Sequence, residues 1–287
     1  MHIVTDRAMD LAPEQMAGFS VKIAPLRLTL DGMTYQSGVD IQPEEFYRLL
    51  GVSEGYPTTS LPSAGEFAEI YRELAREDPE ILSIHISSGL SGTLDAARAG
   101  AAMVPEAHVT FFDSLTLSCP LGWQVEAALR TLKAGWALKD ILDLLEMMRE
   151  KANGIFTLPV LKYLIHGGRI SHLRGLVASM LNIKPIIAVD KITGKYISVA
   201  QEVTFKRAIN KVAESVTHWI PEGGRVRVQL LHGNNLEATE LLRQRMLQLF
   251  ECTFMPTTTV APVLGAHTGP GLVGMAVAPA EIWNQIP

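Results

Sequence analysis

The chain has 287 residues, 47% of them hydrophobic, and its 25 lysines and arginines against 30 aspartates and glutamates give a net charge of −5. This composition excludes an intrinsically disordered chain, and the length allows two domains that each have a core. Because no basic stretch interrupts the negative balance, nucleic-acid binding and electrostatic adhesion to membranes are not expected.

The N-terminus, the cysteines and the apolar segments predict a cytoplasmic protein. Residues 1–6 (MHIVTD) lead directly into a strand without a basic region, so we expect no signal peptide. Cys119 and Cys252 lie far apart and outside any CxxC motif, which is typical of free thiols in a reducing compartment. Residues 252–280 lack Asp, Glu, Lys and Arg, but prolines interrupt them, so we predict buried strands and turns rather than a membrane-spanning helix.

In residues 1–152, strands alternate with helices, which predicts an α/β domain with an open, mostly parallel sheet between two layers of helices. Asp31-Gly32 is a hairpin signal within it. The strands are expected at residues 2–5, 21–30, 81–86 and 108–113, and the helices at 11–16, 43–50, 64–76, 93–104, 122–133 and 140–151.

A hydroxyl-rich loop, residues 57–63 (PTTSLPS), lies between two of these elements and contains two prolines. Ser63 is explained by local structure, because together with Glu66 it forms a capping box for the helix that follows. Thr59 and Ser60 have no such structural role. They are therefore candidates for contacts with a ligand.

Residues 153–287 contain more hairpins and fewer strand–helix–strand units, which predicts an α+β domain with a mixed sheet. A short helix is expected to end at Gly167-Gly168, where the backbone is free to approach a ligand or another loop. Strands are expected at 155–159, 186–189, 196–200, 226–231, 257–260 and 272–277, and longer helices at 173–181, 205–219 and 236–250.

The most informative stretch is the turn at residues 87–93 (SSGLSGT), between a buried strand and a helix. Unpaired backbone N–H groups, hydroxyls and the positive end of a helix dipole gather at such a turn, which suits a carboxylate or a phosphate. The alternative is an ordinary strand–helix turn in which Ser91 or Thr93 only caps the helix.

Two further patterns bear on an enzymatic function. Residues 269–274 match G-x-G-x-x-G by letter, but a strand is expected after them instead of a helix, so we reject a dinucleotide site. Residues 89–93 resemble a nucleophile elbow, so a serine hydrolase could use Ser91 with His267 as base and Asp190 as acid, although nothing local ties them together. The sequence has neither zinc-ligand spacing nor a phosphate-binding P-loop motif.

His267 is the one ionisable residue in the uncharged stretch, and Gly265 and Gly269 lie on either side of it. A lone histidine in apolar surroundings is more often a core residue with satisfied hydrogen bonds than a ligand-binding group. The two glycines also suit close approach of the backbone to a ligand. Both roles therefore stay open for His267.

Seven short motifs follow one another along the whole chain. They are Thr59-Ser60-x-Pro62-Ser63, Ile86-Ser87-Ser88-x-Leu90-Ser91-Gly92-Thr93, Asp113-Ser114, Leu161-Lys162-Tyr163-Leu164, Gly167-Gly168-Arg169-Ile170, Leu181-Asn182-Ile183-Lys184-Pro185 and Gly269-Pro270-Gly271. Taken in this order, the motifs resemble those of the DegV family of bacterial fatty-acid-binding proteins. Arg7 departs from the family pattern, which has a serine there, and residues 118–122 (SCPLG) replace a glycine-rich continuation.

The resemblance implies two α/β domains with a long-chain fatty acid, such as palmitate, stearate or oleate, buried between them. It also implies that Thr59, Ser91 and His267 hold the carboxylate, and that Arg169 lies at the carboxylate end where a partner docks. With their neighbours, these residues form a predicted ligand-binding site of Thr59, Ser60, Ser91, Gly92, Thr93, Arg169, His267 and Thr268.

We therefore predict a monomeric carrier that is not an enzyme by itself, with domains at 1–152 and 153–287, and with no metal or cofactor. Family members of this kind present their fatty acid to a separate ATP-dependent fatty-acid kinase, which makes acyl phosphate, so the resemblance implies this partner. We expect no nucleic-acid partner and no stable membrane insertion. The alternatives are a serine hydrolase or esterase using Ser91, and a lipid sensor without a kinase partner.

Overall fold

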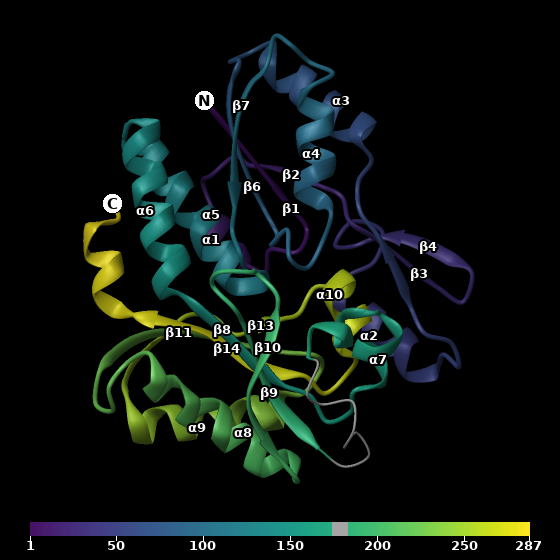
Figure 1. Cartoon of the computed structure of the whole chain (residues 1–287), viewed down its shortest axis with the longest axis vertical. Coiled ribbons are helices and arrows are strands. Elements are labelled where there is room, and N and C mark those ends of the chain that lie inside the picture. Colours follow the sequence, from purple (N-terminus) through teal and green to yellow (C-terminus); the bar gives the residue numbers. More distant parts are fainter. Residues whose placement is uncertain (174–182) are drawn as a thin grey trace.

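A computed structural model describes residues 1–173 and 183–287 of the chain (Figure 1). The first sheet and its helices consist of β1 (His2–Asp6), β2 (Lys22–Ala24), β6 (Glu80–His85), β7 (His108–Asp113), α3 (Ala64–Ala75), α4 (Thr93–Ala101), α5 (Ser118–Lys133) and α6 (Leu138–Lys151). The strands are parallel, in the order β2-β1-β6-β7. Because α3 and α4 cover one face while α5 and α6 lie on the other, the predicted three-layer arrangement is confirmed.

A second, mixed sheet has seven strands among the described residues, in the order β10-β9-β8-β14-β11-β12 with β13 also paired to β11. Neighbouring strands are antiparallel except that β12 and β13 run parallel to β11. The strands are β8 (Asn153–Thr157), β9 (Lys184–Val189), β10 (Tyr196–Glu202), β11 (Arg225–His232), β12 (Glu251–Phe254), β13 (Thr258–Thr259) and β14 (Val273–Pro279). The predicted mixed sheet of the C-terminal half is confirmed.

The two faces of the mixed sheet have different neighbours. Helices α8 (Phe205–Ser215) and α9 (Leu236–Leu249) cover the outer face, and the other face packs against α5 of the N-terminal half (Figure 1). Several short helices lie elsewhere in the described chain: α1 (Pro13–Met16), α7 (Lys162–His166), α10 (Pro262–Thr268) and the 3-10 turns η1 (Arg169–His172), η3 (Val216–His218) and η4 (Ala280–Gln285). The helix expected at 173–181 falls almost entirely outside the described residues.

A smaller antiparallel sheet lies beside the first one. It consists of β3 (Arg27–Leu30), β4 (Met33–Gln36) and β5 (Thr58–Ser60), and α2 (Pro43–Val52) packs against it. The hairpin between β3 and β4 turns at Asp31 and Gly32, which both have positive φ, as the sequence predicted. The loop expected at 57–63 is wrong at its centre, because the prolines only flank a strand that pairs Thr59 with Leu28 of β3.

Two helices differ from the sequence-based expectation. α5 begins at Ser118, earlier than the predicted Gly122, because Pro120 falls in the first turn, where a proline removes no intrahelical hydrogen bond. α10 occupies part of the stretch for which we expected only strands and turns. Almost all of its residues are buried, so it lacks the polar face that gives a surface helix its periodicity.

A buried polar network joins the N-terminal half to the mixed sheet. The carboxylate of Glu126 on α5 accepts hydrogen bonds from Arg227 on β11 (2.8 Å) and from Arg130 (3.1 Å). The Glu126 and Arg227 side chains are only 2% and 10% exposed. The guanidinium carbon of Arg227 lies 5.2 Å from the ring centre of Trp123 and 4.3 Å from that of Trp283. The buried ion pair of Glu126 and Arg227 therefore fixes the position of α5 relative to the mixed sheet.

Substituting Glu126 tests this network. Because Glu126→Leu leaves the buried Arg227 without its carboxylate, we expect it to lower the free energy of unfolding by about 3–5 kcal/mol, measured by urea denaturation. Replacing both partners with leucine should recover part of that loss. Asp143→Ala, which removes an exposed ion pair with Lys139 on α6, is the control and should change little. A loss for Glu126→Leu no larger than the control would contradict the assigned role.

Candidate functional site

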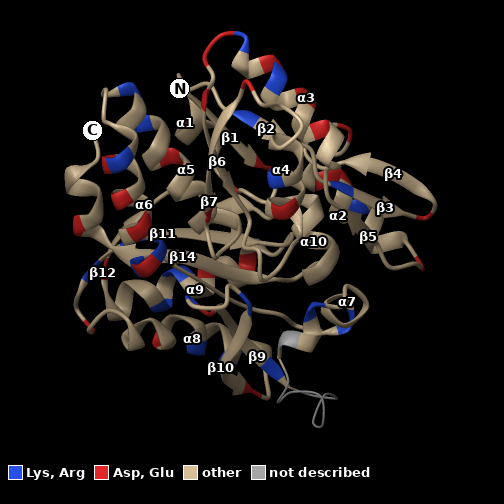
Figure 2. Cartoon of the chain, turned by 45° about the horizontal axis from the view of Figure 1, so that its top comes forward, with Lys and Arg blue, Asp and Glu red and all other residues tan. Residues whose placement is uncertain are grey.

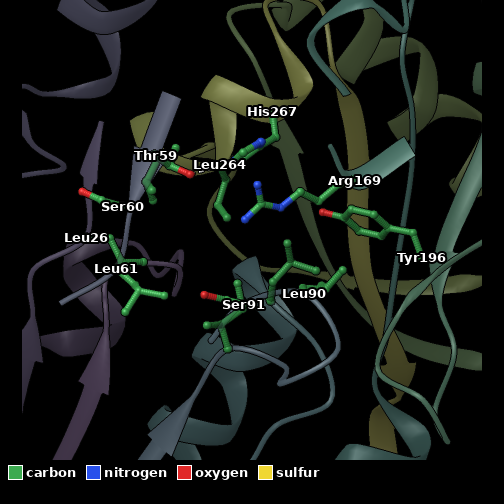
Figure 3. Close-up of a pocket in the computed structure, with 13 residues that line it drawn as sticks. Leu26, Thr59, Ser60, Leu61, Leu90, Ser91, Arg169, Tyr196, Leu264 and His267 are labelled. Carbon is green, nitrogen blue, oxygen red and sulfur yellow. Dashed lines mark hydrogen bonds between the residues drawn. The ribbon is translucent and has the colours of Figure 1, made fainter. Parts of the chain in front are cut away.

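A cavity of about 270 Å³ lies between segments of all three sheets (Figure 3). Most of its walls are leucine, isoleucine and valine side chains, while Thr59, Arg169 and His267 point toward a common space with Ser91 opposite them. The lining residues are Leu26, Thr59, Ser60, Leu61, Ile86, Leu90, Ser91, Leu117, Arg169, Tyr196, Val263, Leu264 and His267. The cavity therefore combines an apolar wall with a small polar cluster.

Asp6, at the end of β1, positions the serine- and glycine-rich turn (residues 87–93) through hydrogen bonds to the strand that leads into it. The carboxylate of Asp6 accepts hydrogen bonds from the backbone N–H groups of Ala8 and Ile86, both at 2.9 Å, and from the His85 ring at the end of β6. Hydrogen bonds within the turn fix its shape, since the backbone N–H groups of Leu90 and Ser91 both donate to the carbonyl of Ser87. This places Ser91 at the cavity.

The residue that caps α4 is Gly92, so the alternative in which Ser91 or Thr93 only caps this helix is wrong. The hydroxyl of Ser91 lies 2.8 Å from that of Thr93 and also accepts the Thr93 backbone N–H. Thr93 is fully buried, and Gly92 is exposed with its Cα beside Leu61. Of the three, only Ser91 lines the cavity, and Thr93 supports it from behind.

Thr59 and His267 come from different halves of the chain and meet at the cavity. Nε2 of His267 on α10 lies 2.8 Å from the hydroxyl of Thr59 on β5. The imidazole packs against Gly167, where an added Cβ would lie 2.1 Å from Nδ1, so this position requires glycine. Burial, assisted by the nearby charge of Arg169, lowers the pKa of His267 to about 4. The ring is therefore neutral near pH 7.

The hydrogen-bond partners indicate where the His267 proton resides. Nδ1 has no partner within residues 1–173 and 183–287. A buried N–H without a partner is rarer in proteins than a buried acceptor without one, so the proton belongs on Nε2, which donates it to Thr59. The hydroxyl hydrogen of Thr59 is then free to point into the cavity as a donor to a ligand.

Arg169 supplies the positive charge of the site. Gly168 has a φ of 76°, a left-handed conformation that reverses the chain between α7 and η1 and directs Arg169 into the cavity. The guanidinium donates to the carbonyl of Gly167 at 2.6 Å and forms no ion pair with any carboxylate in the described part of the chain. Figure 2 shows further basic residues around α7 and at the start of β9.

Ser60 and Thr268, the other two residues of the predicted site, do not point into the central space of the cavity. Ser60 lines the cavity, but its hydroxyl points away from the central space (Figure 3). Thr268 is buried, and its hydroxyl donates to the carbonyl of Leu264, so it does not line this cavity. Tyr196 also lines the cavity, and its hydroxyl points toward Arg169 (Figure 3). The sequence did not indicate this residue, because an isolated tyrosine in a strand belongs to no motif.

The alternative hydrolase arrangement is not assembled. One carboxylate oxygen of Asp190 accepts hydrogen bonds from Ile192 and Thr193 within the β9–β10 turn and makes no contact with His267. The imidazole of His267 is bonded to Thr59 instead of Ser91. The proposed acid, base and nucleophile therefore do not form a chain of hydrogen bonds.

A different Ser-His-Asp chain of hydrogen bonds lies on the face of the first sheet that packs against α3. Ser83 lies 2.8 Å from Nε2 of His85, and Nδ1 of His85 lies 2.9 Å from Asp6. All three side chains are fully buried, and none of them lines the cavity. This chain of hydrogen bonds supports the turn and is closed to a substrate.

Neither a membrane span nor a metal cluster is present within residues 1–173 and 183–287. No helix there is long and apolar enough to cross a membrane. No group of three or more His, Cys, Asp or Glu side chains in the same residues is arranged to hold a metal ion. Cys119 and Cys252 are both free thiols, and Cys119 is buried.

Comparison with known proteins extends over nearly the whole chain. A family model described as "Uncharacterised protein, DegV family" matches residues 1–280. A DegV domain-containing protein of Staphylococcus aureus (strain N315) is 34% identical over 275 residues, which cover 96% of this chain and 97% of that protein.

Two solved structures are also similar. A DegV family protein from Thermus thermophilus, described as binding fatty acid, is 30% identical with a TM-score of 0.86 and covers 97% of this chain and 99% of its own. A stearic acid-binding protein from Eubacterium ventriosum is 25% identical with a TM-score of 0.86 and covers 97% of this chain and 98% of its own. With matches of this extent to the family model and to these relatives, the chain belongs to the DegV family.

Proposed function

We propose that the protein binds one long-chain fatty acid, with its carboxylate at Thr59, Ser91 and Arg169, where His267 orients the Thr59 hydroxyl, and with its acyl chain along the apolar walls of the cavity. The observation that carries this proposal is the pairing of an apolar cavity with one cation, Arg169, that has no carboxylate partner in the described chain. The solved relatives from Thermus thermophilus and Eubacterium ventriosum, which bind fatty acid and stearic acid, support the same ligand class.

The energetics favour such a ligand. Burying a chain of about 16 carbons contributes on the order of 12 kcal/mol, at roughly 0.8 kcal/mol for each CH₂ group. Removing the carboxylate from water costs several kcal/mol unless hydrogen bonds replace the lost water. The Thr59 and Ser91 hydroxyls and the Arg169 guanidinium are suitable donors, and hydrogen bonds to an ionised group are stronger than neutral ones.

The finer role that we propose is that of a monomeric, cytoplasmic carrier that presents the carboxylate to an ATP-dependent fatty-acid kinase. On this proposal the carrier is not an enzyme by itself, since no group in the site attacks the ligand. Its two domains would be residues 1–152 and 153–287. A lipid sensor without a kinase partner would use the same site and would differ only in the step after binding.

Denaturing extraction of the purified protein, with mass spectrometry of the extract, tests the ligand class. We expect about one fatty acid for each chain, because the cavity has one polar cluster. A clean protein that also takes up no added oleate or palmitate would remove the proposal. Turnover of a p-nitrophenyl ester that disappears in Ser91→Ala would instead favour a hydrolase.

The two hydroxyl residues should each contribute to affinity. We expect Ser91→Ala and Thr59→Val to weaken fatty-acid binding by about 1–3 kcal/mol, the usual cost of leaving a charged group short of a partner, measured by titration calorimetry on delipidated protein. Thr58→Val, an exposed neighbour on β5, and Ser88→Ala, which bonds Asp113 away from the cavity, are matched controls. Unchanged affinity in both site variants would refute the assignment.

The neutral His267 predicts a pH dependence of stability. Between its native pKa of about 4 and its ordinary value of 6.5, the unfolded chain binds the extra proton, so stability falls as the pH decreases through this range. In ligand-free protein we expect His267→Gln to remove up to about 1.4 kcal/mol per pH unit of this slope, measured by urea unfolding.

The difference between the pH dependence of unfolding free energy in the wild type and in His267→Gln isolates the contribution of His267. Burial raises the pKa of Asp10 from 3.8 to about 7, so Asp10 has the opposite effect on stability over the whole of this range. Because Asp10 is unchanged in the variant, its effect cancels in the difference between the two chains. Parallel slopes for the two chains would contradict a neutral, buried His267.

Arg169 should matter more for the partner than for affinity. We expect Arg169→Ala to reduce ATP consumption with the kinase by a larger factor than it reduces fatty-acid binding, because a charge at the carboxylate end also faces the reacting group. Lys162→Ala on α7, a nearby cation outside the cavity lining, is the control. Equal losses of binding and turnover in Arg169→Ala would indicate that Arg169 belongs only to the pocket.

A further inference from the structure

A second, smaller cavity of about 40 Å³ lies directly behind the first, and Leu117, Tyr196 and Leu264 line both. Three hydroxyl-bearing residues line it. Ser118 donates to Asp10 at 2.6 Å, and Thr268 donates to a backbone carbonyl at 3.2 Å. The hydroxyl of Tyr196 points toward Arg169 in the first cavity (Figure 3). The interior of this second cavity is therefore apolar. Apolar spaces of this kind exclude water and accept apolar ligand groups.

The mixed sheet forms one wall of the second cavity. Gly154, Ile155 and Phe156 of β8 and Met275 of β14 contribute to this wall. On β14, Val277 packs toward α8 and α9, while alternate residues of the strand belong to the inner face, which packs against α5.

The neighbouring strand β8 places one large residue and one small residue on the same inner face. Phe156 lies against Gly274, where an added Cβ would come within 2.5 Å of the Phe156 Cβ. Its ring is 5.6 Å from the Tyr196 ring in an edge-to-face arrangement, so it forms a wall of the second cavity beside the passage from the first. Gly154 lies two residues away, and a Cβ there would lie 3.2 Å from Pro120.

We propose that the second cavity receives the terminal carbons of the acyl chain and that Phe156 and Gly154 determine the chain length that fits. This inference rests on the proposed fatty-acid binding. With the carboxylate at Arg169, the chain extends along the apolar wall and passes Leu117 and Leu264 into the second cavity. A space of about 40 Å³ admits roughly one terminal carbon group, so a small change in its walls changes the number of carbons that fit.

Two substitutions in opposite directions test the proposal on the full-length protein. Delipidated protein is loaded from an equimolar mixture of saturated fatty acids of graded length, and the bound acids are extracted and quantified by mass spectrometry. Because a truncated aromatic leaves a cavity that the surroundings only partly fill, we expect Phe156→Leu to shift the preferred acid by about one carbon toward longer chains.

Gly154→Ala places a methyl group against Pro120 and should shift the preference by about one carbon toward shorter chains, since the added volume reduces a closely packed space. Val277→Ala, on the opposite face of the same sheet, is the matched control and should leave the distribution unchanged. Phe156→Leu suffices by itself if the more crowded Gly154→Ala chain does not fold.

The outcomes separate the two proposals. Acid bound by the Phe156→Leu variant with the same length distribution as in the wild type would overturn the role of the second cavity and leave fatty-acid binding intact. A shift in Val277→Ala equal to that in Phe156→Leu would also overturn it, because general loosening would then explain both. A wild-type protein that takes up no acid would overturn the proposed function, and this inference with it.

Discussion

The arrangement of the site depends on one buried carboxylate, that of Asp10, which is only 4% exposed. It accepts a hydrogen bond from the hydroxyl of Ser118 at the start of α5 (2.6 Å) and from the N–H of Ala261 at the start of α10 (3.0 Å). A carboxyl group in such a place requires these partners, because burial without them would be strongly unfavourable. Asp10 thereby fixes α5, which borders the second cavity, relative to α10, which carries His267.

Hydrogen-bonded supports of the same kind hold the polar groups of the site, whereas packing alone forms its apolar wall. Asp6 fixes the turn that carries Ser91, and Gly167 leaves the space that His267 occupies. In contrast, apolar side chains such as Leu117, Leu264 and Phe156 form the walls of the two cavities. Polar groups that bind the same carboxylate must be held at fixed positions by hydrogen bonds. An acyl chain needs only sufficient volume and walls without unpaired polar atoms.

Much of this organisation could be predicted from the sequence, because the local signals were strong. The parallel sheet of the first half and the capping box of Ser63 and Glu66 were expected from periodicity and cap residues, and the structure confirms both. The helix α10 could not be predicted, because a helix buried on nearly all sides shows no alternation of polar and apolar faces. The contact between Thr59 and His267 joins positions 208 residues apart, and no pairing rule within a single sequence reveals such a contact.

The charge state of the site restricts what it can hold. Arg169 contributes one positive charge, and His267 is neutral near pH 7 because burial and the guanidinium both lower its pKa. A ligand with a single negative charge balances Arg169, whereas a phosphate would bring a second charge that the neutral imidazole does not compensate. An uncharged ligand would cover the partly buried Arg169 without supplying a carboxylate partner, so the same argument disfavours it. The combination of one charge with an apolar wall therefore favours a monocarboxylic acid with a long hydrocarbon chain.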